Sequence, residues 1–101
     1  MAPVNNFINL TPDERAQTDI RIAMDSVNVV NQIVNNANTV HSEQIDTRVW
    51  ANYKHLEIVL KRDYVTSYVT NNSVDVSALN NAINVGKTFV TNSAFVSANT
   101  I

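Results

Sequence analysis

A single glycine, Gly86, stands among the 101 residues of the chain. An average sequence of this length carries about seven glycines. β-Sandwiches and barrels need glycine, proline or similar turn residues roughly every 8–12 positions. Both prolines, Pro3 and Pro12, come before the first long periodic segment, so the rest of the chain lacks such turns. The sequence therefore predicts an all-α fold.

The first expected helix carries a regular apolar stripe. Its members recur at alternating spacings of four and three residues, which is the period of a helix seam: Ala16, Ile20, Ala23, Val27, Val30, Val34 and Ala37. Further apolar residues widen this face: Ile22, Val29, Ile33 and Val40. Thr11-Pro12-Asp13-Glu14 is a capping box, in which Thr11 and Glu14 hydrogen-bond reciprocally. We expect a helix over 11–40 that starts at Pro12.

Two more helices are expected after this one. The second covers 42–70, with Ser42 as N-cap and an apolar face made of Ile45, Val49, Tyr53, Leu56, Leu60 and Tyr64. The third and shorter one covers 75–91, with an apolar face made of Leu79, Ala82, Ile83, Gly86, Phe89 and Val90. Because no glycine or proline interrupts the chain near His41, the first two helices form either a long hairpin or one kinked continuous helix.

The domain organisation follows from these helices. We expect one domain over 1–101: a long helical hairpin, a short third helix, and extended N- and C-terminal arms over 1–10 and 92–101. Two helices of about 28 residues are each about 42 Å long. A compact chain of about 100 residues has a radius of gyration near 13 Å. The short helix covers only part of such a hairpin, so an apolar stripe should stay exposed and favour association.

Charge and composition disfavour several classes of function. The net charge is −2 and charged residues make up 16% of the chain, so no basic excess favours nucleic-acid binding. The absence of cysteine excludes disulfides, thiolate zinc sites and cysteine nucleophiles. No run approaches the roughly 18 apolar residues that span a bilayer, so no membrane association is expected.

No catalytic, cofactor-binding or metal-binding site is expected. The two histidines, His41 and His55, have no ligand-type residue three or four positions later, where a helical metal site would need one. No G-x-S-x-G motif is present, and one glycine cannot form a phosphate-binding loop. The carboxylates are typical of solvated helix faces. The sequence therefore predicts a protein that is not an enzyme and needs no cofactor.

The candidate interface residues are apolar or aromatic side chains in the arms and on the second helix. They are Phe7, Ile8, Leu10, Trp50, Tyr53, Tyr64, Phe95, Val96 and Ile101. Basic residues interleave with the aromatic ones on the second helix, which is the pattern of a single-strand nucleic-acid binder: Arg48, Lys54, Lys61 and Arg62. Glu57 and Asp63 offset their charge, which makes this a distant third option.

Two segments resemble a known group of proteins. Residues 52–63, Asn-Tyr-Lys-His-Leu-Glu-Ile-Val-Leu-Lys-Arg-Asp, followed by Ser77-Ala78-Leu79, Ala82-Ile83 and Gly86-Lys87, resemble small helical proteins of tailed-bacteriophage structural modules. Those proteins often show an N-x-x-H-L-E-I-x-L helix and then a short helix ending in A-I-x-x-G. The resemblance implies a virion or assembly component without catalytic residues.

We therefore expect a structural protein of a larger particle, a bacteriophage capsid, neck or tail component. Its partners would be further copies of itself and other particle proteins. It would be found in the virion, or in the host cytoplasm during assembly. The alternative is a small helical adaptor or regulator that binds a host protein.

Overall fold

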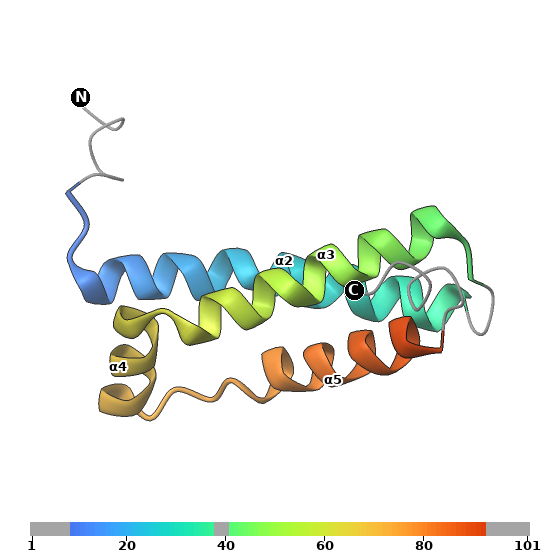
Figure 1. Ribbon diagram of the computed structural model, residues 1–101. Helices are drawn as coiled ribbons and strands as arrows, with labels where there is room; N and C mark the ends of the chain where they lie inside the picture. The colour runs from blue at the N-terminus through green and yellow to red at the C-terminus, as the bar shows by residue number, and fades with distance from the viewer. Residues whose placement is uncertain (1–8, 38–40, 93–101) are drawn as a thin grey trace.

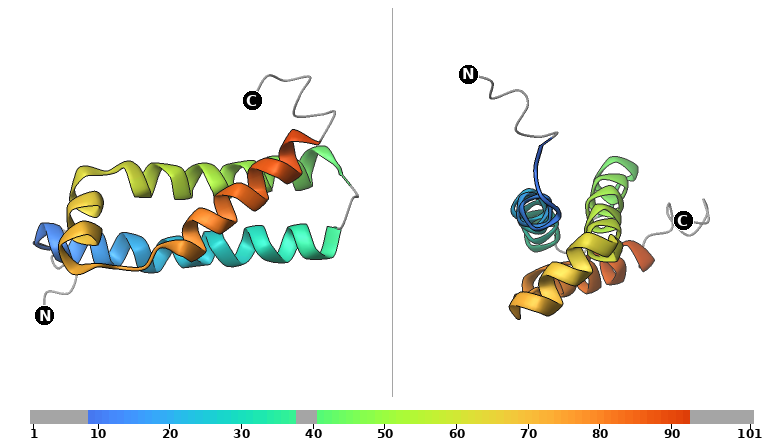
Figure 2. Two further views of the ribbon diagram at one scale, coloured as in Figure 1. Left: turned by 90° about the horizontal axis from the view of Figure 1, so that it is seen from below. Right: turned by 90° about the vertical axis from the view of Figure 1, so that its left-hand side faces the viewer.

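The computed structural model describes residues 9–37 and 41–92 of the chain. These residues form four helices and no strand: α2 (Pro12–Ala37), α3 (Glu43–Lys61), α4 (Asp63–Asn72) and α5 (Ser77–Thr91). The long helices α2 and α3 lie side by side and run in opposite directions (Figure 1). Helix α5 runs diagonally across one face of this pair, and α4 turns across its end (Figure 2). The all-α prediction is confirmed.

The start of α2 is the predicted one. The N–H of Thr11 donates to Oε1 of Glu14 at 2.9 Å, and the N–H of Glu14 donates to Oγ1 of Thr11 at 3.1 Å. The bond from the Thr11 backbone lowers the pKa of Glu14, because it stabilises the carboxylate. The capping box is confirmed. The expected end of this helix at residue 40 lies outside the described residues.

Helices α2 and α3 are two separate helices. Ser42 has an extended backbone, with φ −145° and ψ 160°, and its side chain accepts a hydrogen bond from the N–H of Ile45. Ser42 is therefore the N-cap of α3, as predicted, and the alternative of one kinked continuous helix is wrong.

The prediction of one continuous helix over 42–70 is wrong. Helix α3 ends at Lys61, Arg62 has an extended backbone (φ −67°, ψ 134°), and α4 begins at Asp63. The Arg62 guanidinium donates to Oδ2 of Asp19 on α2 at 2.7 Å. This bond fixes the segment between α3 and α4 against α2. The bend also allows α4 to cover the end of the bundle, where Val65 is fully buried. Four helices are therefore observed where three were expected.

The short C-terminal helix begins two residues later than expected, at Ser77. Asp75 precedes it and accepts hydrogen bonds from the N–H and hydroxyl of Ser77 at 2.9 and 2.6 Å. The reversal between α4 and α5 takes place at Ser73, whose φ of 51° is left-handed. Of the two expected arms, the structure describes Asn9, Leu10 and Asn92; the other arm residues lie outside the described part.

The core lies where α2, α3 and α5 meet. It contains most of the predicted apolar faces, and its buried members are Ala16, Ala23, Val27, Val30, Val49, Tyr53, Leu56, Val59, Val65, Leu79, Ala82, Ile83, Phe89 and Val90. Two of the predicted seam residues of α2, Ile20 and Val34, are only partly buried and pack against this core.

The single glycine lies at the crossing of α5 and α3. A Cβ atom at Gly86 would stand 2.9 Å from Cδ2 of Tyr53 and 3.0 Å from its Cβ. Real Cβ atoms do not approach other carbons so closely, so α5 could not keep this distance with any other residue at position 86. The φ of Gly86 is not positive. Its role is therefore close packing of two helices and not a turn.

Candidate interaction surface

Tyr53 and Trp50, two of the predicted interface residues, lie on α3, and Tyr53 also contacts α5. Tyr53 is 6% exposed and packs against Gly86, and this burial raises the pKa of its hydroxyl. Tyr53 thus belongs to the core of a single copy, and we propose no interface role for it. Trp50 is partly buried at the edge of the core, and its indole Nε1 is buried without a hydrogen-bond partner in the described part of the chain.

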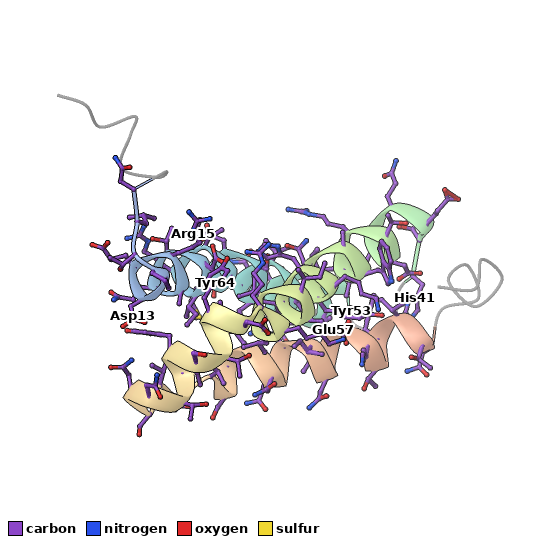
Figure 3. The ribbon with its side chains drawn as sticks, turned by 60° about the vertical axis from the view of Figure 1, so that its left-hand side comes forward. Asp13, Arg15, His41, Tyr53, Glu57 and Tyr64 are labelled. Carbon is purple, nitrogen blue, oxygen red and sulfur yellow. The ribbon has the colours of Figure 1, made fainter. Side chains whose placement is uncertain are left out.

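Tyr64, a third predicted interface residue, takes part in a polar cluster with Asp19 and Arg62. Its hydroxyl and the Arg62 guanidinium both donate to Oδ2 of Asp19. The bond to Asp19 raises the pKa of Tyr64, because the neutral hydroxyl is the form that donates, and it also raises the pKa of Arg62. The cluster ties α2 to the corner between α3 and α4; Tyr64 is labelled in Figure 3.

Leu10 lies beside Tyr64, although the two are far apart in the sequence. Together with Pro12 and Arg15 they line a groove of about 280 Å³ at the start of α2. The structure therefore brings two of the predicted interface residues together at this end of the bundle. The other five, Phe7, Ile8, Phe95, Val96 and Ile101, lie outside the described residues.

A second polar cluster, which the sequence analysis missed, lies at the opposite end of the bundle. Nδ1 of His41 is 2.7 Å from Oδ1 of Asp46, whose side chain is fully buried. The imidazole of His41 also lies against the Phe89 ring of α5, with centroids 4.3 Å apart and the planes tilted by 33°. The pair thus joins the start of α3 to the end of α5.

A signal for this pair is present in the sequence. Asp46 precedes Val49 by three residues and Tyr53 by seven, so it shares their apolar face. A carboxylate at such a position becomes buried and needs a hydrogen-bonding partner. Helical spacing does not relate His41 to Asp46, because His41 precedes the N-cap Ser42, where the helix period does not apply.

A His–Asp pair is also the orienting part of a catalytic triad, in which the histidine contacts a serine hydroxyl. Among residues 9–37 and 41–92, no serine or threonine hydroxyl hydrogen-bonds to His41. Among residues 9–37 and 41–92, no group of three or more histidine or acidic side chains is placed to hold a metal ion. What the structure shows is that the pair packs the start of α3 against the end of α5, through the contact of His41 with Phe89.

A groove of the described surface lies between α2 and α5. It has a volume of about 410 Å³, and its lining is uncharged: Val34 of α2 and Asn84, Val85, Thr88, Phe89 and Asn92 of α5. Phe89, the ring that contacts His41, belongs to this lining. We call this feature the α2–α5 groove.

Helix α2 also keeps an apolar flank that the rest of the fold does not cover completely. We call Ile22, Val29 and Ile33 the α2 flank. Ile22 is 49% exposed, and the other two residues are partly buried. Their spacings of seven and four residues place them on one side of the helix. Ile58 of α3 is the most exposed large apolar residue of the described part, at 54%.

Two of the basic residues on α3 and at its C-terminal end form ion pairs within the chain. Nζ of Lys54 lies 3.2 Å from Oε1 of Glu57, and Nζ of Lys87 lies 2.8 Å from Oε2 of the same carboxylate. Arg62 is bound to Asp19. Two of the four basic residues named for single-strand binding are thus paired within the chain, which disfavours that function.

Comparison with models of protein families, with curated protein sequences and with solved structures finds no match to this chain. No helix in the described residues has both the length and the apolar character needed to cross a membrane.

Proposed function

We propose that the chain is a non-enzymatic structural protein of a larger particle, a bacteriophage virion. The α2 flank is the observation that carries this proposal. In a single copy, its three aliphatic residues form a partly uncovered stripe about 16 Å long on the longest helix. Apolar stripes of this kind mark protein–protein contacts, because covering them removes apolar surface from water.

The identity of the particle rests on the phage resemblance. The two segments that carry it contact each other, since Tyr53 packs against Gly86 and Glu57 binds Lys87. The matching residues thus maintain the crossing of α3 and α5. The chain would reside in the virion, or in the host cytoplasm during assembly.

The assembly part of the proposal is tested by the mass of the purified chain in light scattering. We expect a mass of two or more chains, that is, at least twice the 11.2 kDa of one chain. Ile22→Asp should lower that mass while the helical circular dichroism signal is kept, because the new charge cannot be desolvated in a contact. Asn28→Asp is the matched control, since it adds the same charge at another exposed position of α2.

Two results would contradict the proposal. A wild-type chain that stays monomeric over the whole accessible concentration range would refute self-assembly. Absence of the chain from the mass spectra of purified phage particles would refute the virion assignment and favour the adaptor that binds a host protein.

A further inference from the structure

We propose that the exposed side of α5 packs against the same side of α5 in a second copy of the chain, in an antiparallel two-fold contact centred on Val85. This inference rests on the proposed assembly function and names one of its contacts.

The exposed side of α5 has the residue spacing of a contact between two helices. One side of α5 packs against α2 and α3, and the other side faces outward (Figure 2). On the outward side, exposed residues recur at alternating spacings of three and four, which is the period of a helix seam. We call these residues the α5 seam: Ala78, Asn81, Val85, Thr88 and Asn92. At its middle, the aliphatic side chain of Val85 is 37% exposed.

The α5 seam borders the α2–α5 groove. Val85, Thr88 and Asn92 line this groove of about 410 Å³, together with Phe89. A helix that lies along the seam therefore meets a concave surface. The Phe89 ring is held by its contact with His41, and a surface that is already ordered loses less entropy when a partner binds.

The α5 seam holds none of the seven basic and nine acidic residues of the chain. Lys87 is the only charged residue of α5, and its Nζ lies 2.8 Å from Oε2 of Glu57 on α3. Helix faces that stay in water usually carry charged residues, whereas the centres of protein interfaces are depleted of them. The seam therefore has the composition of a contact surface.

The residues of the seam favour a second copy as the partner. A two-fold contact brings a surface against itself, so a charged residue near the axis would meet its own charge. An uncharged surface avoids this repulsion. The seam is also nearly symmetric about Val85, because Asn81 lies four residues before it and Thr88 three residues after it, and Ala78 and Asn92 each lie seven residues away.

An antiparallel pair matches these residues with one another. Val85 then meets Val85 of the second copy, and Asn81 meets Thr88 of the second copy, twice by symmetry. The amide of Asn81 both donates and accepts hydrogen bonds, so it is a suitable partner for a hydroxyl. The contact thus has an apolar centre and a polar rim, as protein interfaces usually do. A parallel pair would instead bring the like ends of the two helix dipoles together.

The α5 seam and the α2 flank lie on different sides of α2. Ile22 of the flank comes twelve residues before Val34 of the groove, which places the two side chains about 120° apart around the helix. Contacts on two different sides of one chain allow an assembly to grow beyond a pair.

The absence of cysteine from the chain allows a direct test by disulfide trapping. One full-length preparation carries Asn81→Cys and an affinity tag, and a second untagged preparation carries Thr88→Cys. The two are mixed in reductant so that subunits exchange, then oxidised and separated on a non-reducing gel. We expect mixed dimers to exceed the dimers of either variant alone, because an antiparallel pair places two copies of the same cysteine about 9–12 Å apart along the helices. Asn80→Cys in place of Thr88→Cys is the control, since Asn80 is exposed on α5 but lies outside the seam.

Light scattering supplies a second measurement. Val85→Asp should lower the mass of the wild-type oligomer while the helical circular dichroism signal is kept, because symmetry places two new carboxylates together at the axis. Asn80→Asp adds the same charge to the same helix outside the seam and should leave the mass unchanged.

Three outcomes would overturn the inference. The first is no mixed dimer above the Asn80→Cys control. The second is a preference for dimers of one variant, which is the pattern of a parallel pair. The third is a Val85→Asp variant whose light-scattering mass equals that of the wild type. An oligomeric wild type that shows any of these refutes this contact alone, whereas a monomeric wild type refutes the assembly function and this contact with it.

Discussion

At the α4 end of the bundle, Asp19 accepts hydrogen bonds from Arg62 and Tyr64 at a partly exposed corner. At the opposite end, Asp46 pairs with His41 beneath the Phe89 ring. The Asp19 side chain is 15% exposed and that of Arg62 is 39% exposed, whereas the Asp46 side chain is fully buried. Both ends thus use an aspartate as hydrogen-bond acceptor, but in different solvent environments; Figure 3 labels Tyr64 at one end and His41 at the other.

The two clusters therefore contribute differently to the stability and the geometry of the fold. An ion pair near water adds little stability, because solvent already satisfies its charges. The Asp19 cluster mainly fixes the angle at which α4 leaves α3. A buried carboxylate that loses its bonding partner is costly, so the Asp46 cluster is tied to the stability of the fold and to the shape of the α2–α5 groove.

The largest effect is expected at the buried end. Asp46→Ala should lower the free energy of unfolding by about 2–3 kcal/mol, because it removes buried hydrogen bonds and leaves the His41 ring without its carboxylate. Urea denaturation followed by circular dichroism measures this loss. Glu43→Ala, an exposed acidic residue in the same helical turn, is the control and should change stability far less.

At the exposed end, Asp19→Ala should cost about 1–2 kcal/mol, since it removes two hydrogen bonds that solvent partly replaces. Tyr64→Phe should cost less, and the double variant should be less destabilised than the sum of the two. Asp46→Ala and Tyr64→Phe should instead be additive within about 0.5 kcal/mol, because the two ends are far apart. Strong coupling between the ends would show that they do not act separately.

The crossing of α3 and α5 lies between these two ends. Gly86→Ala should destabilise the fold by about 1 kcal/mol. Overpacking against Tyr53 costs about 1–3 kcal/mol, and the better helix propensity of alanine offsets about 1 kcal/mol of this cost. Asn81→Ala, at an exposed position of the same helix, should be neutral or stabilising. If Gly86→Ala stabilises the chain as much as this control does, α5 does not need the close approach.

The parts of this fold that could be predicted are those that local sequence determines. The capping box at Thr11 and the alternating spacing of the α2 seam involve neighbouring residues alone, and both predict helix. The break at Arg62 could not be predicted in this way, because Asp19, which binds it, lies 43 residues earlier in the chain. No glycine or proline marks the position.

The candidate interaction surface also combines features set by neighbouring residues, which the sequence predicts, with features set by residues distant in the sequence, which it does not. The short last helix predicts an uncovered apolar stripe on the hairpin, and the α2 flank, with Ile22 49% exposed, is a stripe of this kind. An aromatic residue at helical spacing, such as Tyr53, fits a core as well as an interface, and only the position of Gly86 on another helix decides between them. The His41–Asp46 pair spans a helix start, where no single period relates the two residues.

The smallest effect is expected for the link between α3 and α5 at Glu57. The hydrogen bond from Lys87, and to a lesser degree that from Lys54, lowers the pKa of Glu57 below its ordinary value of 4.5. A carboxyl whose pKa is lower in the folded state stabilises the fold above its ordinary pKa and loses that contribution as the pH falls through the folded value. Glu57→Gln should therefore cost less than about 1 kcal/mol at pH 7, as is usual for surface ion pairs, and the difference from wild type should shrink to nothing in acid. Denaturation curves between pH 7 and pH 2 measure this difference in the free energy of unfolding.

The two lysines of this link should differ in their effect. At pH 7, Lys87→Gln should destabilise the fold more than Lys54→Gln does, because Lys87 reaches Glu57 from the other helix, and this loss should likewise shrink in acid. A difference that persists undiminished at pH 2 would mean that Glu57 stabilises the crossing through packing and not through its charge.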